Sequence, residues 1–283
     1  MLWHFSMTAQ NYATPFTLLH AASLLSHSSR LRKFEVAINN AVDEGSEVVD
    51  LGSGTGVLAL MAARAGAKKV TAIDINAESM AYAKKAAKLN GLEDNIEFVH
   101  RHFADYKPAK KVDVVICEML SSMMLIEQQV PACIHAIEHI LREGGILLPN
   151  SIDVYAVPVE FAALWNRFSV SNLQFPRVPQ SIERGNARDL ADLSLIHSID
   201  FQGKDVSGMV EKELRFKIIE NGEAHGLVGM FEATLEKGNK LTMSDGWREL
   251  FIPFEESKRV VNGNVLKLKL KYEMGKFDSL YLR

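Results

Sequence analysis

Two carboxylates stand nine residues apart in an otherwise apolar run, VICEMLSSMMLIEQQ, which spans residues 115–129. They are Glu118 and Glu127, and Met, Leu, Ser and Ile occupy the positions between them. Two acids that share an apolar site raise each other's pKa, and a bound cation relieves their repulsion. The pair is therefore expected to select a positively charged group.

A guanidinium is a cation that such a pair would suit. Its planar fork of N–H donors favours bidentate contacts with carboxylates, but it is a poor nucleophile because it is charged and delocalised. Two carboxylates can localise the charge on one nitrogen, leave another nitrogen with a usable lone pair and hold it in position. The alternative is structural: Glu118 only caps the loop, and Glu127 is an exposed helix acid.

A glycine-rich turn, GSGTG, lies between a predicted strand and a predicted helix. Its Gly52 and Gly54 lack the Cβ atoms that would keep a nucleotide-like ligand away from the backbone. Asp74 ends the next strand, where an acid can accept both ribose hydroxyls. The turn is not GxGxxG and no Lys-Ser/Thr follows it, which argues against NAD(P) and P-loop nucleotides. S-adenosylmethionine remains as the candidate cofactor. The alternatives are a tight turn without a ligand for the glycines and a solvated strand-end acid for Asp74.

Further residues are candidates for holding this cofactor. Asp50 lies at the end of the first strand, beside the turn. Phe103 could flank an adenine ring and Asp105 could accept from its amino group, or the two could be a core residue and a turn residue. The cofactor's α-carboxylate needs a cation, for which Arg30 and Arg32 are candidates, with a solvated helix face as the alternative for both.

Short strands alternate with helical stretches from about residue 46 to residue 150. Predicted strands are EVVDLG, KVTAIDI, IEFVHRHF and VDVVICEM. Predicted helices are VLALMAARAG, AESMAYAKKAAKLN with Asn76 as its N-cap, and ACIHAIEHILRE, opened by Pro131. This alternation predicts a doubly wound, mostly parallel sheet.

The pattern changes after Pro149. SIDVYAVPV and VLKLKLKYEM alternate as half-buried strands do, whereas ARDLADLSLI is predicted to be helical. A nucleic-acid patch is the alternative for the lysines of VLKLKLKYEM. The second half is thus predicted to be mainly β, a barrel or a sandwich. The expected division is a helical lead-in at 1–45, a nucleotide-binding domain at 46–150 and a β-rich domain at 151–283.

The bulk composition narrows the function classes. The formal net charge is −3, with 32 basic and 35 acidic residues, so neither a nucleic-acid partner nor a membrane partner is expected. No run reaches the ~20 apolar residues of a membrane span, and the N-terminal sequence does not resemble a secretory signal. Cys117 and Cys133 have neither metal-like nor redox-like spacing, which indicates no metal site and a cytoplasmic location.

Three stretches together resemble the protein arginine methyltransferase family: HSSRLRKFEVAINNAV, VVDLGSGTGVLALMAARAGAKKVTAID and VDVVICEMLSSMMLIE. The resemblance covers about residues 20–160. It implies a class I methyltransferase Rossmann-like sheet followed by a mainly antiparallel β-barrel, with S-adenosyl-L-methionine as cofactor. The family's double-E loop is matched by Glu118 and Glu127. Its cofactor-carboxylate arginine precedes an aromatic residue by four positions, which selects Arg30, before Phe34.

The departures from the family lie on its substrate side. Gly246, before Trp247, replaces the His of a Thr-His-Trp element, and His27 replaces its acidic partner. Tyr12 does not match the family's paired-tyrosine helix. Residues around 161–200 are the place for a helical arm through which the family forms dimers.

Three functions therefore remain open on the sequence. The first is methylation of a protein arginine, and the second is methylation of a small guanidino or amino compound. The third is a cofactor-binding module without turnover. Trp247 would line the substrate channel by cation–π contact in the first two, or lie in the barrel core.

Overall fold

The computed structural model describes residues 17–203 and 206–283. Tyr12 and the start of the predicted lead-in lie outside these described residues. The chain divides into two compact units. Unit 1 holds the described part of Met1–Leu120, with Glu127–Asn150 and Thr234–Asn239; unit 2 holds Ser121–Ile126, Ser151–Ala233 and Lys240–Arg283.

Unit 1 is built on a five-stranded parallel sheet in the order β3-β2-β1-β4-β5. The interiors of β1, β2 and β4 are mostly apolar and buried, as is usual for parallel strands covered on both faces. The strand order reverses between β1 and β4. In sheets of this kind a ligand binds beyond the carboxyl ends of the strands at that point. The strands are β1 Glu47–Leu51, β2 Lys69–Asp74, β3 Ile96–His100, β4 Val112–Cys117 and β5 Leu141–Leu148.

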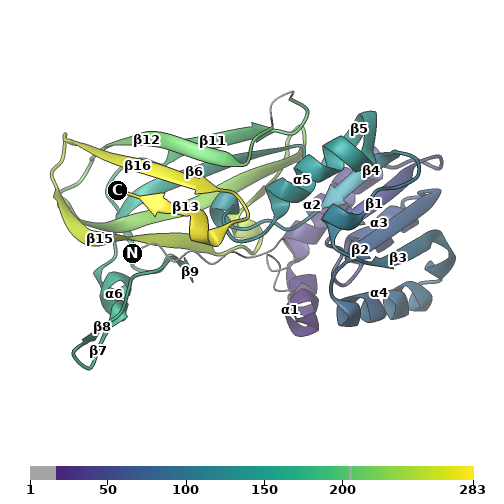
Figure 1. Ribbon diagram of the computed structural model, residues 1–283, viewed down its shortest axis with the longest axis horizontal. Helices are drawn as coiled ribbons and strands as arrows, with labels where there is room; N and C mark the ends of the chain where they lie inside the picture. Colours follow the sequence, from purple (N-terminus) through teal and green to yellow (C-terminus); the bar gives the residue numbers. More distant parts are fainter. Residues whose placement is uncertain (1–16, 204–205) are drawn as a thin grey trace. The chain divides into compact units, whose positions relative to one another are not determined.

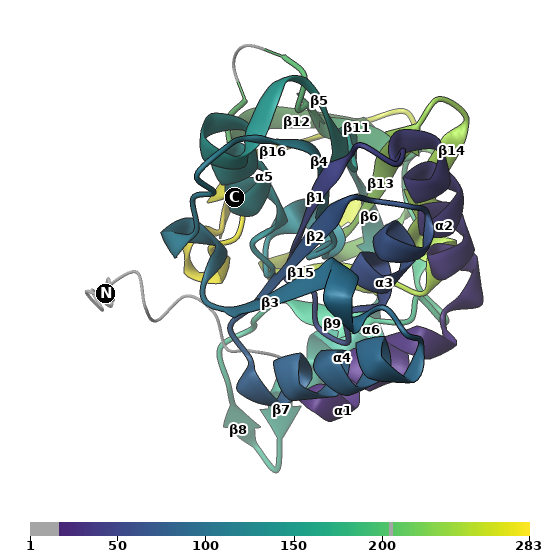
Figure 2. The same cartoon turned by 90° about the vertical axis from the view of Figure 1, so that its right-hand side faces the viewer.

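Helices cover both faces of this sheet, with α5 on one side and α2 and α3 on the other (Figure 2). Asn76 caps α4 by accepting from the backbone N–H groups of Glu78 and Ser79, at 2.9 and 3.1 Å, which confirms the predicted N-cap. The helices are α1 Leu18–Ser23, α2 Ser28–Ala41, α3 Val57–Arg64, α4 Ala77–Leu89 and α5 Gln129–His135, which a π-helical turn, Ala136–Ile140, extends.

The third predicted helix is wrong at both ends. It begins at Gln129 rather than at Pro131, because proline is tolerated in the first turn, where its missing N–H has no intrahelical partner. Leu141 already belongs to β5 and pairs with Val112, so the sheet competes successfully for residues with a helical pattern.

Unit 2 is mainly antiparallel, as the sequence predicts (Figure 1). Its largest sheet has the order β10-β6-β13-β15-β9, with β11 beside β6 and β14 beside β13. A three-stranded sheet, β12-β16-β17, contacts it where β11 meets β12. These strands are β6 Ser151–Glu160, β9 Gln180–Ile182, β10 Arg188–Asp189, β11 Ser194–Asp200, β12 Met209–Lys217, β13 Gly222–Glu236, β14 Asn239–Thr242, β15 Glu249–Val260, β16 Val265–Glu273 and β17 Tyr281–Leu282.

The alternating pattern of β16 is confirmed. Leu268 and Leu270 are buried, while the three lysines between Val265 and Tyr272 are exposed. Strand β16 pairs along its whole length with β12.

The predicted helix ARDLADLSLI is wrong, because this segment forms β10 and the start of β11, both of which pair with β6. In the segment 161–200 the helical residues are α6, Ala162–Trp165, and a 3-10 turn, Asn166–Phe168. A short hairpin follows, made of β7 Ser169–Val170 and β8 Leu173–Gln174.

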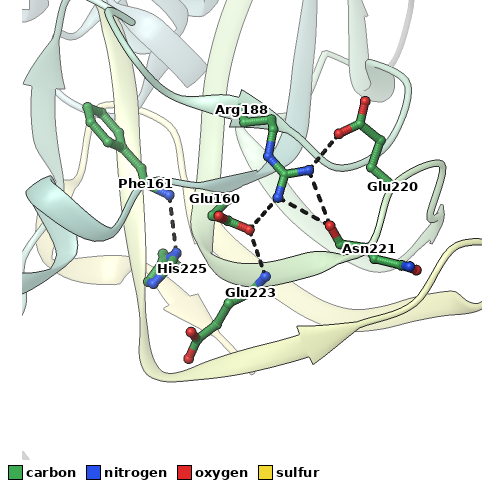
Figure 3. Close-up of polar contacts among 7 residues, drawn as sticks. All are labelled: Glu160, Phe161, Arg188, Glu220, Asn221, Glu223 and His225. Atoms are coloured by element: carbon green, nitrogen blue, oxygen red, sulfur yellow. Dashed lines mark hydrogen bonds and ion pairs between the residues drawn. The ribbon is translucent and has the colours of Figure 1, made fainter.

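An ion network fixes one end of the larger sheet (Figure 3). Arg188 on β10 contacts Glu160 on β6 and Glu220, each at 2.6 Å, and both of its terminal nitrogens donate to the carbonyl of Asn221 at 3.2 Å. A Cβ atom at Gly222 would collide with Glu160 and Arg188. Glycine therefore allows this turn to pack against the arginine.

Candidate functional site

The glycine turn lies at the reversal point of the unit 1 sheet. Gly52, Gly54 and Gly56 all have positive φ, at 70°, 52° and 78°. This backbone conformation strains any residue with a Cβ atom. The N–H groups of Gly52 and Ser53 both donate to the carbonyl of Ile73, at 2.9 Å, so the end of β2 holds the turn.

Asp74, at the end of β2, organises the same turn. One carboxylate oxygen accepts from the Gly54 N–H at 2.8 Å, and the other accepts from the Asn76 N–H at 2.7 Å. A carboxylate oxygen has more than one lone pair, so both oxygens can accept a further hydrogen bond. The carboxylate predicted to contact a ribose thus lies against the glycine turn.

Asp50, near the end of β1, is almost fully buried, with 1% of its surface exposed. Its carboxylate accepts from the Ala59 N–H at 3.1 Å, in the first turn of α3. Its pKa is raised to about 7, mainly by burial and also by the charges of Asp74 and Glu118, whereas the Ala59 hydrogen bond opposes this rise. Asp50 is thus a protonatable group at the reversal point.

The two candidate arginines of α2 are in different surroundings. Arg30 is buried, with 3% of its surface exposed, whereas Arg32 is exposed. The guanidinium of Arg30 lies 3.5 Å from the carboxylate of Glu118. Arg30 is therefore the candidate that lies next to one of the two glutamates.

Glu118 directly follows β4, and Glu127 lies two residues before α5. Burial raises the pKa of Glu118, and the charge of Arg30 opposes this shift. The pKa of Glu127 is raised to about 8, mainly by burial and also by the charge of Glu118, while the charge of Arg30 opposes the rise. The two carboxylates are thus electrostatically coupled and share one arginine.

Asp50, Glu118 and Glu127 form an acid cluster, because Asp50 and Glu127 both interact electrostatically with Glu118, and Arg30 opposes the pKa shifts of the two glutamates. Their pKa values are raised mainly by burial, so ionising all three is unfavourable until another cation arrives. S-adenosylmethionine is cationic at its sulfonium and at its amino group. The acid cluster and the glycine turn therefore fit this cofactor.

The candidate adenine residues lie on the 3-10 turn η4, Phe103–Asp105, which follows β3. Phe103 is buried; its ring centroid lies 4.3 Å from that of His102 and 6.1 Å from that of His135. Asp105 is exposed. The turn thus has a packed aromatic residue and an open carboxylate, beside the carboxyl end of β3.

The chain between the two glutamates leaves unit 1 and returns to it. Ser122–Met124 form a 3-10 turn within unit 2, and Met123 and Met124 are fully buried with positive φ. The carbonyl of Met123 accepts from the hydroxyl of Tyr272 at 3.0 Å. The carbonyl of Met124 accepts from the Gly275 N–H at 2.8 Å. Unit 2 therefore anchors the link between the two carboxylates.

The residues that depart from the family are placed as follows. Gly246 has φ 107° and ends the turn Met243–Asp245, where a histidine would be strained. Trp247 packs edge-on against Phe231, with ring centroids 5.3 Å apart. His27 precedes α2, and burial lowers its pKa, as does the neighbouring charge of Arg30.

Sequence reasoning missed Gln129, the first residue of α5. It is fully buried, and its side-chain amide contacts the backbone on both sides of Glu118. The sequence signal was present, because a polar residue stands two positions after Glu127 at the start of an apolar helix face. It could not be interpreted without knowing that α5 packs against the end of β4.

The described part of the chain has neither a membrane-spanning helix nor a metal-binding group. No helix within it is both long and apolar enough to cross a membrane. Residues 17–203 and 206–283 also contain no group of three or more His, Cys, Asp or Glu side chains that could hold a metal ion.

Comparison with known proteins shows a methyltransferase domain in unit 1. A family model described as a methyltransferase domain matches residues 48–145. A probable protein arginine N-methyltransferase 6 from Arabidopsis thaliana is 34% identical over 138 residues, which are 48% of this chain and 32% of that protein. Protein arginine N-methyltransferase 6 from Danio rerio is 40% identical over 122 residues, 43% of this chain and 34% of that protein. The chain thus spans about a third of the length of these relatives.

Longer matches extend over both units. Protein arginine N-methyltransferase 1 from Dictyostelium discoideum is 25% identical over 252 residues, 81% of this chain and 73% of that protein. The Trypanosoma brucei PRMT1 enzyme–prozyme heterotetrameric complex with AdoHcy has a TM-score of 0.77 at 18% identity, covering 94% of this chain and 96% of that one. Arabidopsis thaliana protein arginine methyltransferase 10 has a TM-score of 0.74 at 20% identity, with coverages of 92% and 89%. Residues 48–145 thus match a methyltransferase domain, and over both units the chain is similar in sequence and in fold to protein arginine methyltransferases.

Proposed function

We propose that this chain is an S-adenosylmethionine-dependent N-methyltransferase that acts on a guanidino nitrogen held by Glu118 and Glu127. The observation that carries the proposal is the coupled pair of raised-pKa carboxylates beyond β4, with Arg30 3.5 Å from Glu118. Its position beside a glycine turn in a methyltransferase domain supports the assignment.

Each candidate residue has a role in this proposal. Gly52 and Gly54 let the cofactor approach the backbone, and Asp74 accepts its ribose hydroxyls. The remaining four hold its other groups: Arg30 binds the α-carboxylate, Asp50 offsets the positive charge, Phe103 flanks the adenine ring and Asp105 accepts from the adenine amino group.

The two glutamates act on the acceptor. When bound, S-adenosylmethionine supplies an electrophilic methyl group on a positively charged sulfur. Glu118 and Glu127 localise the guanidinium charge and aim one nitrogen along the line of attack. That nitrogen would take the methyl group, and the sulfur of the cofactor would keep the electron pair of the broken bond. The nitrogen then loses a proton, which Glu127 can accept because its pKa is raised to about 8.

A small guanidino or amino compound is the second candidate acceptor. Gly246 and His27 favour it, because they replace both members of an interaction on the substrate side of the family. The strained φ of 107° at Gly246 also means that a histidine could not simply be restored there. The same carboxylate pair would bind either acceptor.

We also propose that the parts of the chain divide the work as the sequence suggests. Residues 46–150 bind the cofactor, and 151–283 help to select the acceptor. The segment 161–200 contributes to a homodimer; its hairpin exposes Val170 and Leu173, and Phe175 beyond it is exposed as well. Cys117 and Cys133 are buried free thiols, which suits a cytoplasmic protein.

Labelling with radioactive S-adenosylmethionine tests the proposal. The purified protein is incubated with a cell lysate, which is then separated into protein, RNA and small-molecule fractions. Glu118→Gln is compared with Glu97→Gln, a matched change on an exposed residue of β3. Label in the protein fraction that only Glu118→Gln loses would support arginine methylation, and label only in small molecules would support the second candidate. No label in any fraction, despite measurable cofactor binding, would contradict both.

A further inference from the structure

Strand β4 loses both neighbours just before Glu118. Its pairing with β1 ends at Leu51 opposite Cys117, because Gly52 turns away with φ 70°. Its pairing with β5 ends at Leu148 opposite Ile116, and the following Pro149 has no N–H to offer. The backbone that presents Glu118 is therefore not held by the sheet.

The side chain of Gln129 takes over at this point. Its Oε1 accepts from the Met119 N–H at 2.7 Å, and its Nε2 donates to the Cys117 carbonyl at 2.9 Å. A neighbouring parallel strand would bond to the same two groups, the carbonyl before a residue and the N–H after it. The carboxamide thus substitutes for a strand across Glu118.

The same side chain links Glu118 to the segment that presents Glu127. Gln129 lies two residues after Glu127 and begins α5, and it is fully buried. Its Nε2 also lies 3.2 Å from the Sγ of Cys133, one helical turn further on. Because α5 packs against β4, the amide joins the backbones of the two glutamates.

We propose that Gln129 is a positioning residue that sets the separation and direction of Glu118 and Glu127. It touches neither the acceptor nor the cofactor, and it acts through the backbone of Glu118. This inference rests on the proposed function for its effect on catalysis. Only a carboxamide of this length offers one donor and one acceptor at these two places, since glutamate can only accept when ionised, and methionine is a weak acceptor and no donor.

Two variants separate positioning from stability. Gln129→Met keeps the length and burial of the side chain but removes both hydrogen bonds beside Glu118. Cys133→Ala keeps both hydrogen bonds beside Glu118, removes the contacts of the Cys133 thiol with Gln129 and with the Cys117 side chain, and leaves a small cavity, so it also lowers stability. We expect Gln129→Met to speed hydrogen exchange at the Met119 amide and to lower kcat on the order of 10- to 100-fold, since a misplacement of about 1 Å can cost about 100-fold.

Cys133→Ala should leave the Met119 exchange rate and kcat close to those of the wild type. Both variants should keep the wild-type affinity for S-adenosylhomocysteine. Equal kcat in the two variants would overturn the inference, and so would unchanged exchange at Met119 in Gln129→Met.

A second readout tests the role of Gln129 even if the proposed function is wrong. If the wild type turns over no acceptor, the readout becomes its affinity for a peptide with a single central arginine, with S-adenosylhomocysteine present. Gln129→Met should then bind this peptide at least about 10-fold more weakly than Cys133→Ala, and equal affinities would overturn the inference.

Discussion

At the scale of single residues, the acid cluster of unit 1 is defined by its burial. Burial raises the pKa values of Asp50, Glu118 and Glu127, and Arg30 opposes this shift at the two glutamates. Buried carboxylates with raised pKa values are frequent at functional sites, where a positively charged ligand would favour their ionised form.

The pKa of Glu127 predicts how activity depends on pH. Its carboxylate must be ionised to bind a guanidinium, and its pKa is raised to about 8. We therefore expect kcat/KM to rise about tenfold per pH unit below pH 8 and to level off above it. Initial rates between pH 6 and 9.5 test this; a flat profile down to pH 6 would mean that Glu127 does not titrate in the free enzyme.

Asp50 predicts how stability depends on pH. Its pKa of about 7 in the folded state lies above its ordinary value of 3.8. Its favourable contribution is therefore present below about pH 4 and is lost as the pH rises through 7. Asn does not titrate, so Asp50→Asn does not lose this contribution. The unfolding free energy of the variant, relative to that of the wild type, should therefore be about 3 kcal/mol higher at pH 8 than at pH 5.

Urea unfolding of the ligand-free protein at the two pH values measures this difference. Asp94→Asn, on an exposed residue, is the control and should track the wild type. A difference between Asp50→Asn and the wild type that does not grow with pH would contradict the raised pKa.

At the scale of elements, the glycine turn also packs closely against α4. A Cβ atom at Gly56 would lie 2.8 Å from the Cβ of Ala83 on α4, whereas one at Gly91 would meet nothing within 4 Å. Both residues have positive φ, at 78° and 65°. Comparing them therefore separates backbone strain from collision.

Gly56→Ala and Gly91→Ala form the matched pair for this test. Gly91→Ala should cost about 1–2 kcal/mol of unfolding free energy, from the left-handed backbone alone. Gly56→Ala should cost a further 1–3 kcal/mol or so, because the inserted methyl group overpacks the contact with Ala83. Denaturant unfolding measures both, and equal costs would contradict the close packing of the glycine turn against α4.

The helices and strands show which parts of the fold could be predicted from the sequence. The parallel strands and the Asn76 cap were predictable, because their signals are local: buried β-branched runs and a side chain that accepts from its own helix. Leu141–Glu143 and ARDLADLSLI were predicted as helix and are strand, because pairing with distant strands overrode a helical pattern. Glu118 and Glu127 were recognisable from their spacing, whereas Gln129 required the packing of α5 on β4.

At the scale of the whole molecule, the chain segment that joins the two glutamates is held by contacts within unit 2. Residues 121–126 belong to unit 2, although Glu118 and Glu127 belong to unit 1. Tyr272, fully buried in unit 2, donates to the carbonyl of Met123 within this link. Tyr272 thus holds the segment that joins the two glutamates.

Tyr272→Phe tests the role of this contact. It removes one buried hydrogen bond and leaves the Met123 carbonyl without that donor, which should cost about 1–3 kcal/mol. We expect kcat to fall several-fold while the affinity for S-adenosylhomocysteine is unchanged, because the cofactor residues all lie in unit 1. Loss of stability with full kcat would show that the link does not position the carboxylates.

Methylation of a defined peptide tests the role of the two glutamates most directly. The purified protein is incubated with S-adenosylmethionine and a peptide that contains a single arginine, and mass spectrometry locates any added methyl group. We expect the wild type and Glu97→Gln to methylate the arginine, and Glu127→Gln to lose this activity by about 100-fold or more while still binding S-adenosylhomocysteine. Undiminished arginine methylation by Glu127→Gln would contradict the carboxylate pair as the acceptor site.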